Sequence, residues 1–338
     1  SLSLPASRRP WLPDLAPTYR LEALPTERND TELIFGVADV PTDQAQPVVG
    51  FLPDRDGNMA VFGTGGSGKS SFLRSLAVAA GFAPARGGPV TVYAFDFGSR
   101  GLQMLEGLPH VAAVATSDDH ERIVRVLKQL RSTIDERAVR FAAVSADSVV
   151  QYRERSGRAD EARILLLVDN FASFRQSYEL GERSRWFEMF QGIMGDGRPV
   201  GVHVVISADR PAALPSSLSS AVQRRLVLRL ANDMDYSMLG APADAFSAMS
   251  PPGRGFMDGQ EIQVGVLGGD PNMARQAHEI SRLSESMARA GVVAVPRVMR
   301  LPDRVIGSEL PVEVSGEPVL GVWDESLEAI TFDPSGVF

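Results

Sequence analysis

Residues 59–70 read M-A-V-F-G-T-G-G-S-G-K-S, a short apolar run that leads directly into a glycine-rich loop. The loop, Gly63–Ser70, satisfies every fixed position of G-x-x-x-x-G-K-[ST], a phosphate-binding motif. The following residues have apolar side chains at helical spacing, and we expect Gly81 to end that helix. This strand–loop–helix order predicts a nucleotide site.

The chemistry of the loop suits a triphosphate. Glycines let backbone N–H groups turn toward phosphate oxygens, and the start of the following helix adds a partial positive charge. Lys69 is expected to contact the β- and γ-phosphates, and the Ser70 hydroxyl to bind Mg²⁺. We therefore predict ATP and Mg²⁺ as cofactors. The predicted nucleotide-binding residues are Gly63, Thr64, Gly65, Gly66, Ser67, Gly68, Lys69, Ser70 and Ser71.

Two other interpretations of the loop stay open. Gly63, Gly65 and Gly68 also satisfy G-x-G-x-x-G, and Asp96 follows another apolar run as the ribose-binding acid of a dinucleotide site would. That motif is looser and has no use for the lysine and serine that follow. A glycine-rich turn without a ligand is disfavoured by the strand and helix on either side. Asp96 itself is expected to cap a turn.

Another apolar run, Ile164–Val168, ends in Asp169 and Asn170. Beside a P-loop this pattern indicates a Walker B strand, whose aspartate helps to hold magnesium; an ordinary strand-end aspartate is the alternative. Hydrolytic relatives usually have glutamate at the next position, whereas an amide orients water but does not accept its proton at neutral pH. Loss of a general base typically slows a reaction by ~10²–10⁴-fold. We therefore expect binding to survive and fast hydrolysis to be lost.

Further candidate residues lie near the end of the apolar run Val200–Ser207. Ser207, at the tip of that strand, is a candidate sensor of the γ-phosphate, with a plain turn hydroxyl as the alternative. The predicted catalytic set is Lys69, Asp169, Asn170 and Ser207, and the predicted metal ligands are Ser70 and Asp169. Candidate arginines acting in trans within a ring are Arg198, Arg210 and Arg224, each with a structural ion pair as the alternative.

Apolar runs and helical patterns alternate from residue 58 onward, which predicts a mainly parallel α/β sheet covered on both faces. Two short strands, Glu32–Val37 and Pro47–Leu52, are expected before it, and Tyr152–Asp160 is expected to be a surface loop. The predicted parallel strands are 59–62, Val90–Phe95, Ile164–Val168, Val200–Ser207 and Leu226–Leu230. The predicted helices include one capped by Ser117 or Asp118, one over Glu182–Ile193 and an amphipathic one from Met273 to Met287. Gly255–Met257 and Glu261–Leu267 predict a β-hairpin.

The composition excludes several classes of site. With 338 residues, 44% hydrophobic and 22% charged, the chain has enough apolar material for one large or two ordinary domains. No apolar run reaches the ~18–20 residues of a membrane span. The absence of cysteine excludes disulfides and thiolate chemistry, and the four histidines never occur at metal-ligand spacing. A net charge of −8 makes DNA an unlikely partner.

Prolines punctuate both ends of the chain. Residues 1–30 contain five prolines and are predicted to be an extended inter-domain linker. Near the other end, Gly321-Val322-Trp323-Asp324 parallels Gly36-Val37-Ala38-Asp39, which predicts the start of a second nucleotide domain unless the match is a coincidence. We therefore expect a linker at 1–30, a P-loop ATPase domain at 31–290, and a linker with the first strands of a following, truncated ATPase domain at 291–338.

Six segments of the chain, taken together, suggest a family. They are Phe62–Ser71, Tyr93–Gly98, Leu108–Val111, Val168–Asn170, Gly201–Arg210 and Pro252–Gly255. In these the chain resembles the FtsK/SpoIIIE family of RecA-like ATPases, and within it the EccC/EssC coupling proteins of type VII secretion. Residues 10–13 resemble the family's linker between its first and second ATPase domains. The resemblance implies a RecA-like P-loop fold and a middle, second ATPase domain.

The resemblance also implies a setting. The whole protein is expected to be a membrane-anchored motor that faces the cytoplasm, forms hexamers and exports small helical substrates. Neighbouring ATPase domains are expected on the same polypeptide. Linkers of the family dock on ATPase domains, so residues 296–320 are expected to lie on this one. We expect an ATP-binding module with weak or no hydrolysis that serves regulation, assembly and substrate docking. The alternatives are an active ring ATPase for protein export or DNA translocation, and an interaction module that ignores nucleotide.

Overall fold

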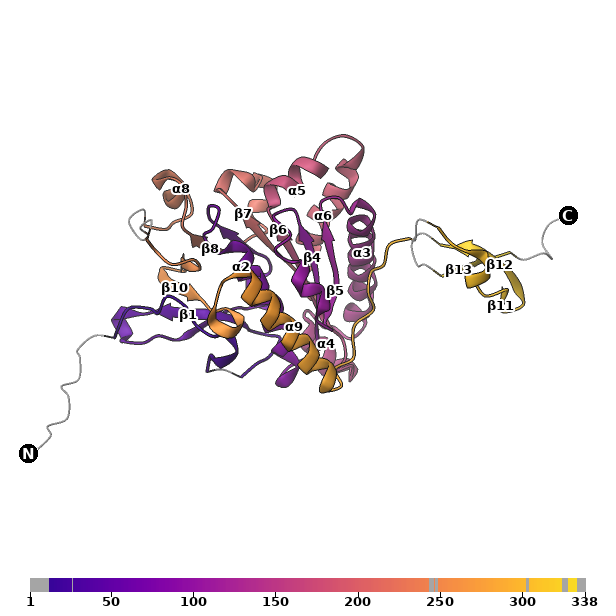
Figure 1. Cartoon of the computed structure of the whole chain (residues 1–338), viewed down its shortest axis with the longest axis horizontal. Helices are drawn as coiled ribbons and strands as arrows, with labels where there is room; N and C mark the ends of the chain where they lie inside the picture. The colour runs from indigo at the N-terminus through magenta and orange to yellow at the C-terminus, as the bar shows by residue number, and fades with distance from the viewer. Residues whose placement is uncertain are drawn as a thin grey trace, which may run out of the picture.

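The computed structural model describes residues 12–25, 27–242, 246, 249–301, 304–323 and 328–332. Its centre is a ten-stranded sheet of order β2-β1-β10-β9-β8-β3-β7-β6-β4-β5 (Figure 1). The strands from β8 to β5 are parallel, and those from β2 to β9 form antiparallel pairs. The parallel strands are β3 (Met59–Phe62), β4 (Val90–Asp96), β5 (Val111–Thr116), β6 (Arg163–Asp169), β7 (Val202–Ala208) and β8 (Arg224–Leu228). The antiparallel strands are β1 (Leu33–Asp39), β2 (Val48–Phe51), β9 (Arg254–Met257) and β10 (Gln260–Val264).

Helices cover both faces of the parallel part. On β6, Leu165 and Leu167 face a core shared with α2, whereas Leu166 and Val168 face a core shared with α3, α5 and α6. This two-sided burial explains why the parallel strands are continuous apolar runs. The longer helices are α2 (Lys69–Phe82), α3 (His120–Ala143), α4 (Val149–Ser156), α5 (Phe171–Tyr178), α6 (Ser184–Asp196) and α9 (Met273–Arg289). The shorter ones are α1 (Pro53–Asp56), α7 (Ser216–Ser219) and α8 (Asp233–Met238).

The predicted fold class is confirmed, and most predicted strands and helices occur within a few residues of their expected bounds. The predicted hairpin is β9 and β10, which join the main sheet beside β8. Strand β5 was not predicted, because half of its sequence V-A-A-V-A-T is alanine, which is a weak β-strand signal. Within the described residues, no helix is both long enough and apolar enough to span a membrane.

Three local predictions were wrong. Helix α2 continues through Gly81 to Phe82, so this glycine does not end it. The first part of the expected surface loop, residues 152–156, belongs to α4, because Tyr152 is buried and stacks on Phe141 with ring centroids 4.2 Å apart. The cap of α3 is Asp119, whose side chain accepts from the Arg122 N–H, rather than Ser117 or Asp118.

The N-terminal segment packs on the domain earlier than expected. Leu15, Leu21 and Leu24 are buried in the core beneath α2. The Leu21 N–H donates to the Val266 carbonyl at 3.0 Å, beside β10. Part of the predicted linker therefore packs against the domain that we expect to begin at residue 31. The first part of this predicted linker, residues 1–11, lies outside the described residues.

The C-terminal linker lies along the open edge of β5. The Val295 N–H donates to the Pro109 carbonyl at 2.8 Å, and the Val298 N–H donates to the Ala112 carbonyl at 3.0 Å. Arg122 of α3 donates in turn to the Val298 carbonyl at 2.8 Å. Docking on this domain, expected for residues 296–320, is thus seen from Val295 to Leu301, whose N–H donates to the Glu121 carboxylate at 2.8 Å. From Glu313 onward, the expected docking segment instead belongs to a separate sheet.

Beyond the linker, the chain forms a small separate sheet (Figure 1). Its strands are β11 (Glu313–Val314), β12 (Glu317–Val322) and β13 (Ala329–Thr331). The antiparallel pair β12–β13 shifts register between Val319 and Gly321, and the pair β1–β2 shifts between Ile34 and Gly36. The two irregularities fall at the same position of the predicted sequence repeat.

Candidate functional site

The P-loop lies at the carboxyl end of β3, between β7 and β8 in the sheet. Parallel pairing brings the carboxyl ends of β3, β7, β6 and β4 to one edge, where open α/β sheets bind their ligands. A cavity of about 650 Å³ opens there. Its lining residues are Thr64, Gly65, Gly66, Gly68, Lys69, Ser70, Ser71, Arg74, Gly98, Ser99, Asp169, Asn170, Asp209, Pro252, Asp270, Pro271, Asn272 and Met273.

The shape of the loop leaves room for phosphates. A Cβ atom added at Gly65 or Gly66 would meet no atom within 4 Å, so the loop is open on the cavity side. At Gly68, by contrast, a Cβ would lie 2.5 Å from the Gly253 nitrogen, and the Gly253 N–H donates to the Ser67 carbonyl at 2.8 Å. The segment before β9 therefore packs directly against the loop. This close contact leaves no room for a side chain at Gly68.

The predicted metal ligands are brought together. The Ser70 hydroxyl donates to Asp169 Oδ2 at 2.7 Å, across the gap between α2 and β6. Asp169 is buried, and its other oxygen accepts from the Ser207 hydroxyl at 2.5 Å. Within the described part of the chain, no group of three or more His, Asp or Glu side chains could hold a metal ion. A hard cation at Ser70 and Asp169 would therefore need phosphate and water oxygens to complete its shell.

Ser207 lies behind Asp169 rather than in the cavity. Its side chain is fully buried, and its hydroxyl also accepts from the Asn170 backbone N–H at 2.9 Å. This geometry orients the carboxylate of Asp169, the predicted Walker B residue. The γ-phosphate-sensing role of Ser207 stays a prediction.

Asn170 lines the cavity, but its amide is already engaged. The residue has the left-handed φ of 57° and caps α5, with its side-chain oxygen accepting from the Ser173 N–H. Its amide nitrogen donates to the Phe97 carbonyl at 3.1 Å and to the Ser173 hydroxyl at 2.8 Å. Asn170 thus has a local structural role in addition to its position beside the Walker B aspartate.

Sequence reasoning missed Arg74, a buried cation in this cavity. Its guanidinium donates to the Gly101 carbonyl at 3.1 Å and to the Ser71 hydroxyl at 2.9 Å. Burial lowers the pKa of Arg74, whereas the charges of Asp169 and Asp96 oppose that shift. The signal was weak because an arginine one turn after a P-loop serine is common on any solvated helix face.

Asp96 has the turn-capping role expected of it. One carboxylate oxygen accepts from the Gly98 N–H at 3.1 Å and the other from the Leu102 N–H at 2.7 Å. Burial, together with the nearby charge of Asp169, raises the pKa of Asp96. It is therefore fixed in the turn after β4.

The candidate trans-acting arginines lie in three different places. Arg198 precedes β7 and donates to the Asp54 carbonyl at 2.9 Å. Arg224 begins β8 and pairs with Asp258 at 2.9 Å. Arg210 is exposed beyond the carboxyl end of β7 and lines a different small hollow. Their trans-acting role stays a prediction.

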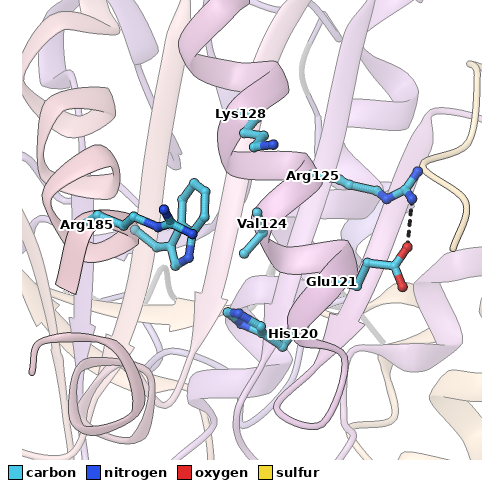
Figure 2. Close-up of a pocket in the computed structure, with 7 residues that line it drawn as sticks. His120, Glu121, Val124, Arg125, Lys128 and Arg185 are labelled. Carbon is cyan, nitrogen blue, oxygen red and sulfur yellow. Dashed lines mark hydrogen bonds and ion pairs between the residues drawn. The ribbon is translucent and has the colours of Figure 1, made fainter. Parts of the chain in front are cut away.

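A second cavity, of about 480 Å³, lies between α3 and α6 (Figure 2). Arg185 lies over the Trp186 ring at 4.3 Å from its centroid, and Arg125 pairs with Glu121 at 2.7 Å. The lining residues are His120, Glu121, Val124, Arg125, Lys128, Arg185 and Trp186. It shares no lining residue with the P-loop cavity.

Comparison with known proteins assigns the family. The FtsK/SpoIIIE family profile matches residues 20–253, from the N-terminal segment to the glycine that buttresses the P-loop. The chain belongs to the FtsK/SpoIIIE family. This FtsK/SpoIIIE domain is 32% identical over 310 residues to the ESX-4 secretion system protein EccC4 of Mycobacterium tuberculosis. It is 27% identical over 240 residues to the type VII secretion system protein EssC of Staphylococcus aureus.

The matches cover most of this FtsK/SpoIIIE domain but little of its relatives. They span 89% of the chain and 24% of EccC4, and 68% of the chain and 16% of EssC. A structure of ATPases 2 and 3 of EssC from Geobacillus thermodenitrificans superposes with a TM-score of 0.78 at 21% identity, over 95% of this chain and 62% of that one. ATPases 2 and 3 of Thermomonospora curvata EccC, solved with a signal sequence peptide, superpose with a TM-score of 0.70 at 25% identity, over 95% and 60%. The RecA-like architecture is therefore shared with EccC and EssC ATPase domains.

Proposed function

We propose that this domain binds ATP with Mg²⁺ as one module of a type VII secretion ATPase, with weak or no hydrolysis. The observation that supports it most directly is the Ser70–Asp169 hydrogen bond of 2.7 Å at the mouth of an open P-loop. There Ser70 and Asp169 would hold the metal, and the P-loop amides would hold phosphate oxygens. Bound Mg²⁺ would neutralise phosphate charge. The absence of a carboxylate at position 170 supports slow turnover.

The proposed setting is a tandem array of ATPase domains. The relatives are proteins several times the length of the matched region, and the neighbouring structures contain ATPases 2 and 3. The shared register shift in β1–β2 and β12–β13 supports a following domain that begins near residue 317. We infer that the segment along β5 is the connection to it. We propose that this domain is the second ATPase of the array and lies in the cytoplasm. We further propose that the full-length protein forms hexamers and that its substrates are small helical proteins.

The test is a single-turnover experiment. Excess protein is mixed with trace radiolabelled ATP and Mg²⁺, and both retained label and released phosphate are followed over hours. We expect retention with little release, and loss of retention in Lys69→Ala, because that side chain is the cation of the P-loop. Release within seconds would contradict the weak-hydrolysis part of the proposal. If neither wild type nor Lys69→Ala retains label, the domain would be an interaction module that ignores nucleotide.

The second candidate is an active ring ATPase. Arg210, exposed beside the site edge, is the observation that favours it, since a neighbouring subunit can supply a missing group in trans. Phosphate release that rises steeply with protein concentration and falls in Arg210→Ala would support that candidate.

A further inference from the structure

Asp209 follows β7 directly, and its carboxylate contacts the P-loop lysine. The Lys69 Nζ lies 2.7 Å from Asp209 Oδ1, and it also donates to the carbonyls of Gly63 and Thr64. An ammonium group has three donors, so these three acceptors satisfy it completely. Of the contacts described for this ammonium group, Asp209 supplies the one from outside the loop. The Lys69 ammonium group, which we expect to contact phosphate, is therefore paired with the Asp209 carboxylate of the same chain.

We propose that Asp209 competes with nucleotide for Lys69 and thereby sets the affinity of the site for ATP relative to ADP. The inference rests on the proposed ATP site and adds a residue that determines its selectivity. The Asp209 carboxylate must leave Lys69 before that ammonium group can contact the β- and γ-phosphates. ATP therefore binds at the expense of an existing ion pair.

The burial of the two partners makes this exchange reversible. The Lys69 side chain is 12% exposed and that of Asp209 is 64% exposed. The lysine is thus fixed by the loop, whereas the carboxylate can rotate into solvent. Ser207, two residues earlier, is buried and bonded to Asp169, so the end of β7 itself is anchored. Only the Asp209 side chain needs to move.

Selectivity follows from charge. Once displaced, the Asp209 carboxylate stays near the terminal phosphates, and like charges placed together oppose binding. The γ-phosphate adds charge close to Lys69, so the penalty is larger for ATP than for ADP. Three aspartates line the cavity: Asp169, Asp209 and Asp270. Asp209 is the one paired with this lysine, whereas Asp270 accepts from the Asn272 N–H at 2.9 Å.

The test compares Mg-ATP and Mg-ADP dissociation constants, by calorimetry on the full chain, among wild type, Asp209→Asn and Asp270→Asn. We expect Asp209→Asn to bind ATP about tenfold more tightly and ADP with a smaller gain. Asp270→Asn removes the same charge from the same cavity and keeps an oxygen acceptor for Asn272. It should change ATP affinity by less than about threefold. Equal melting temperatures of the three proteins would exclude a folding effect.

Several outcomes would overturn the inference. Equal gains in ATP affinity in the two variants would indicate that any negative charge in the cavity weakens binding, rather than competition for Lys69. A loss of phosphate release in Asp209→Asn without tighter binding would make Asp209 a general base. If wild type binds ATP and Asp209→Asn binds it equally, the competition is absent and the proposed function stands. If neither protein binds ATP, both fail; binding by Asp209→Asn alone would support both.

Discussion

At the scale of single residues, the candidate site combines an intact phosphate-binding loop with an asparagine, Asn170, where a carboxylate is expected. Lys69, Ser70 and Asp169 are all in contact with partners that belong to the same site. Asn170 replaces the usual carboxylate, and its amide caps α5 in a left-handed conformation that asparagine tolerates better than most residues. Position 170 is therefore constrained by folding, in addition to the effect on hydrolysis that we propose for it.

Asn170→Glu tests that double constraint. A glutamate would lose the cap on α5 and the donor to the Phe97 carbonyl, and it would be strained at a φ of 57°. We expect the free energy of unfolding to fall by about 1–3 kcal/mol in urea denaturation. We also expect phosphate release to rise by about a hundredfold, because a proton acceptor returns. Asn170→Asp, which keeps an acceptor for the Ser173 N–H, is the control and should lose less stability. An unchanged rate in Asn170→Glu would show that the missing base does not limit hydrolysis.

At the scale of elements, α2 is positioned by close packing at Gly81. A Cβ there would lie 2.4 Å from His110 Cε1 and 2.9 Å from Met287 Cε. His110 has little freedom to move, since its Nε2 lies 2.8 Å from the Ala77 carbonyl oxygen and burial lowers its pKa to about 4. The glycine therefore lets α9 and the turn before β5 approach the P-loop helix.

Gly81→Ala should destabilise the protein although alanine is the better helix former. We expect a loss of about 1–3 kcal/mol in the free energy of unfolding, because the added methyl group overpacks the contact. The matched control is Gly195→Ala in α6, where a Cβ would meet nothing within 4 Å. That variant should gain up to about 1 kcal/mol from helix propensity. Equal effects in the two urea titrations would contradict the packing argument.

At the scale of the whole molecule, segments from both ends complete the domain. Leu15 and Leu21 fill the core beneath α2, and Val298 is buried against the edge of β5. Arg300 pairs with Asp119, the cap of α3, at 2.8 Å. The linker thereby covers an edge strand that would otherwise present free carbonyl groups to other chains.

Val298→Asp should release this linker. An aspartate would place an unpaired carboxylate among apolar side chains and forfeit the burial of the valine, worth about 1.5–3 kcal/mol. We expect trypsin to cleave at Arg297 and Arg300 at least about tenfold faster than in wild type, because local opening becomes easier. Val293→Asp, at a position that is 87% exposed, is the control and should be cleaved at the wild-type rate. Identical digestion of both variants would mean that the linker does not depend on this contact.

The sequence by itself determined the P-loop, the strand that ends at Asp169 and the alternation of strands and helices, because each depends on local spacing and on apolar runs. It also predicted the meeting of Ser70 and Asp169, since parallel strands bring their carboxyl ends to one edge. It failed where the apolar side chains were small, as at β5, or where a helix was polar outside and buried inside, as at α4.

Tertiary structure alone decided which groups engage the site residues. The Lys69–Asp209 pair, the Arg74 contact with Gly101 and the docking of Val298 on β5 join residues far apart in the chain. No local pattern specifies such contacts, because they depend on which strands and loops lie next to one another in the folded sheet. For the same reason, local spacing does not predict the hydrogen bond from the Asn170 amide nitrogen to the Phe97 carbonyl, which lies at a neighbouring strand end. Local spacing defines the nucleotide loop, and the packing of distant segments determines what competes for it.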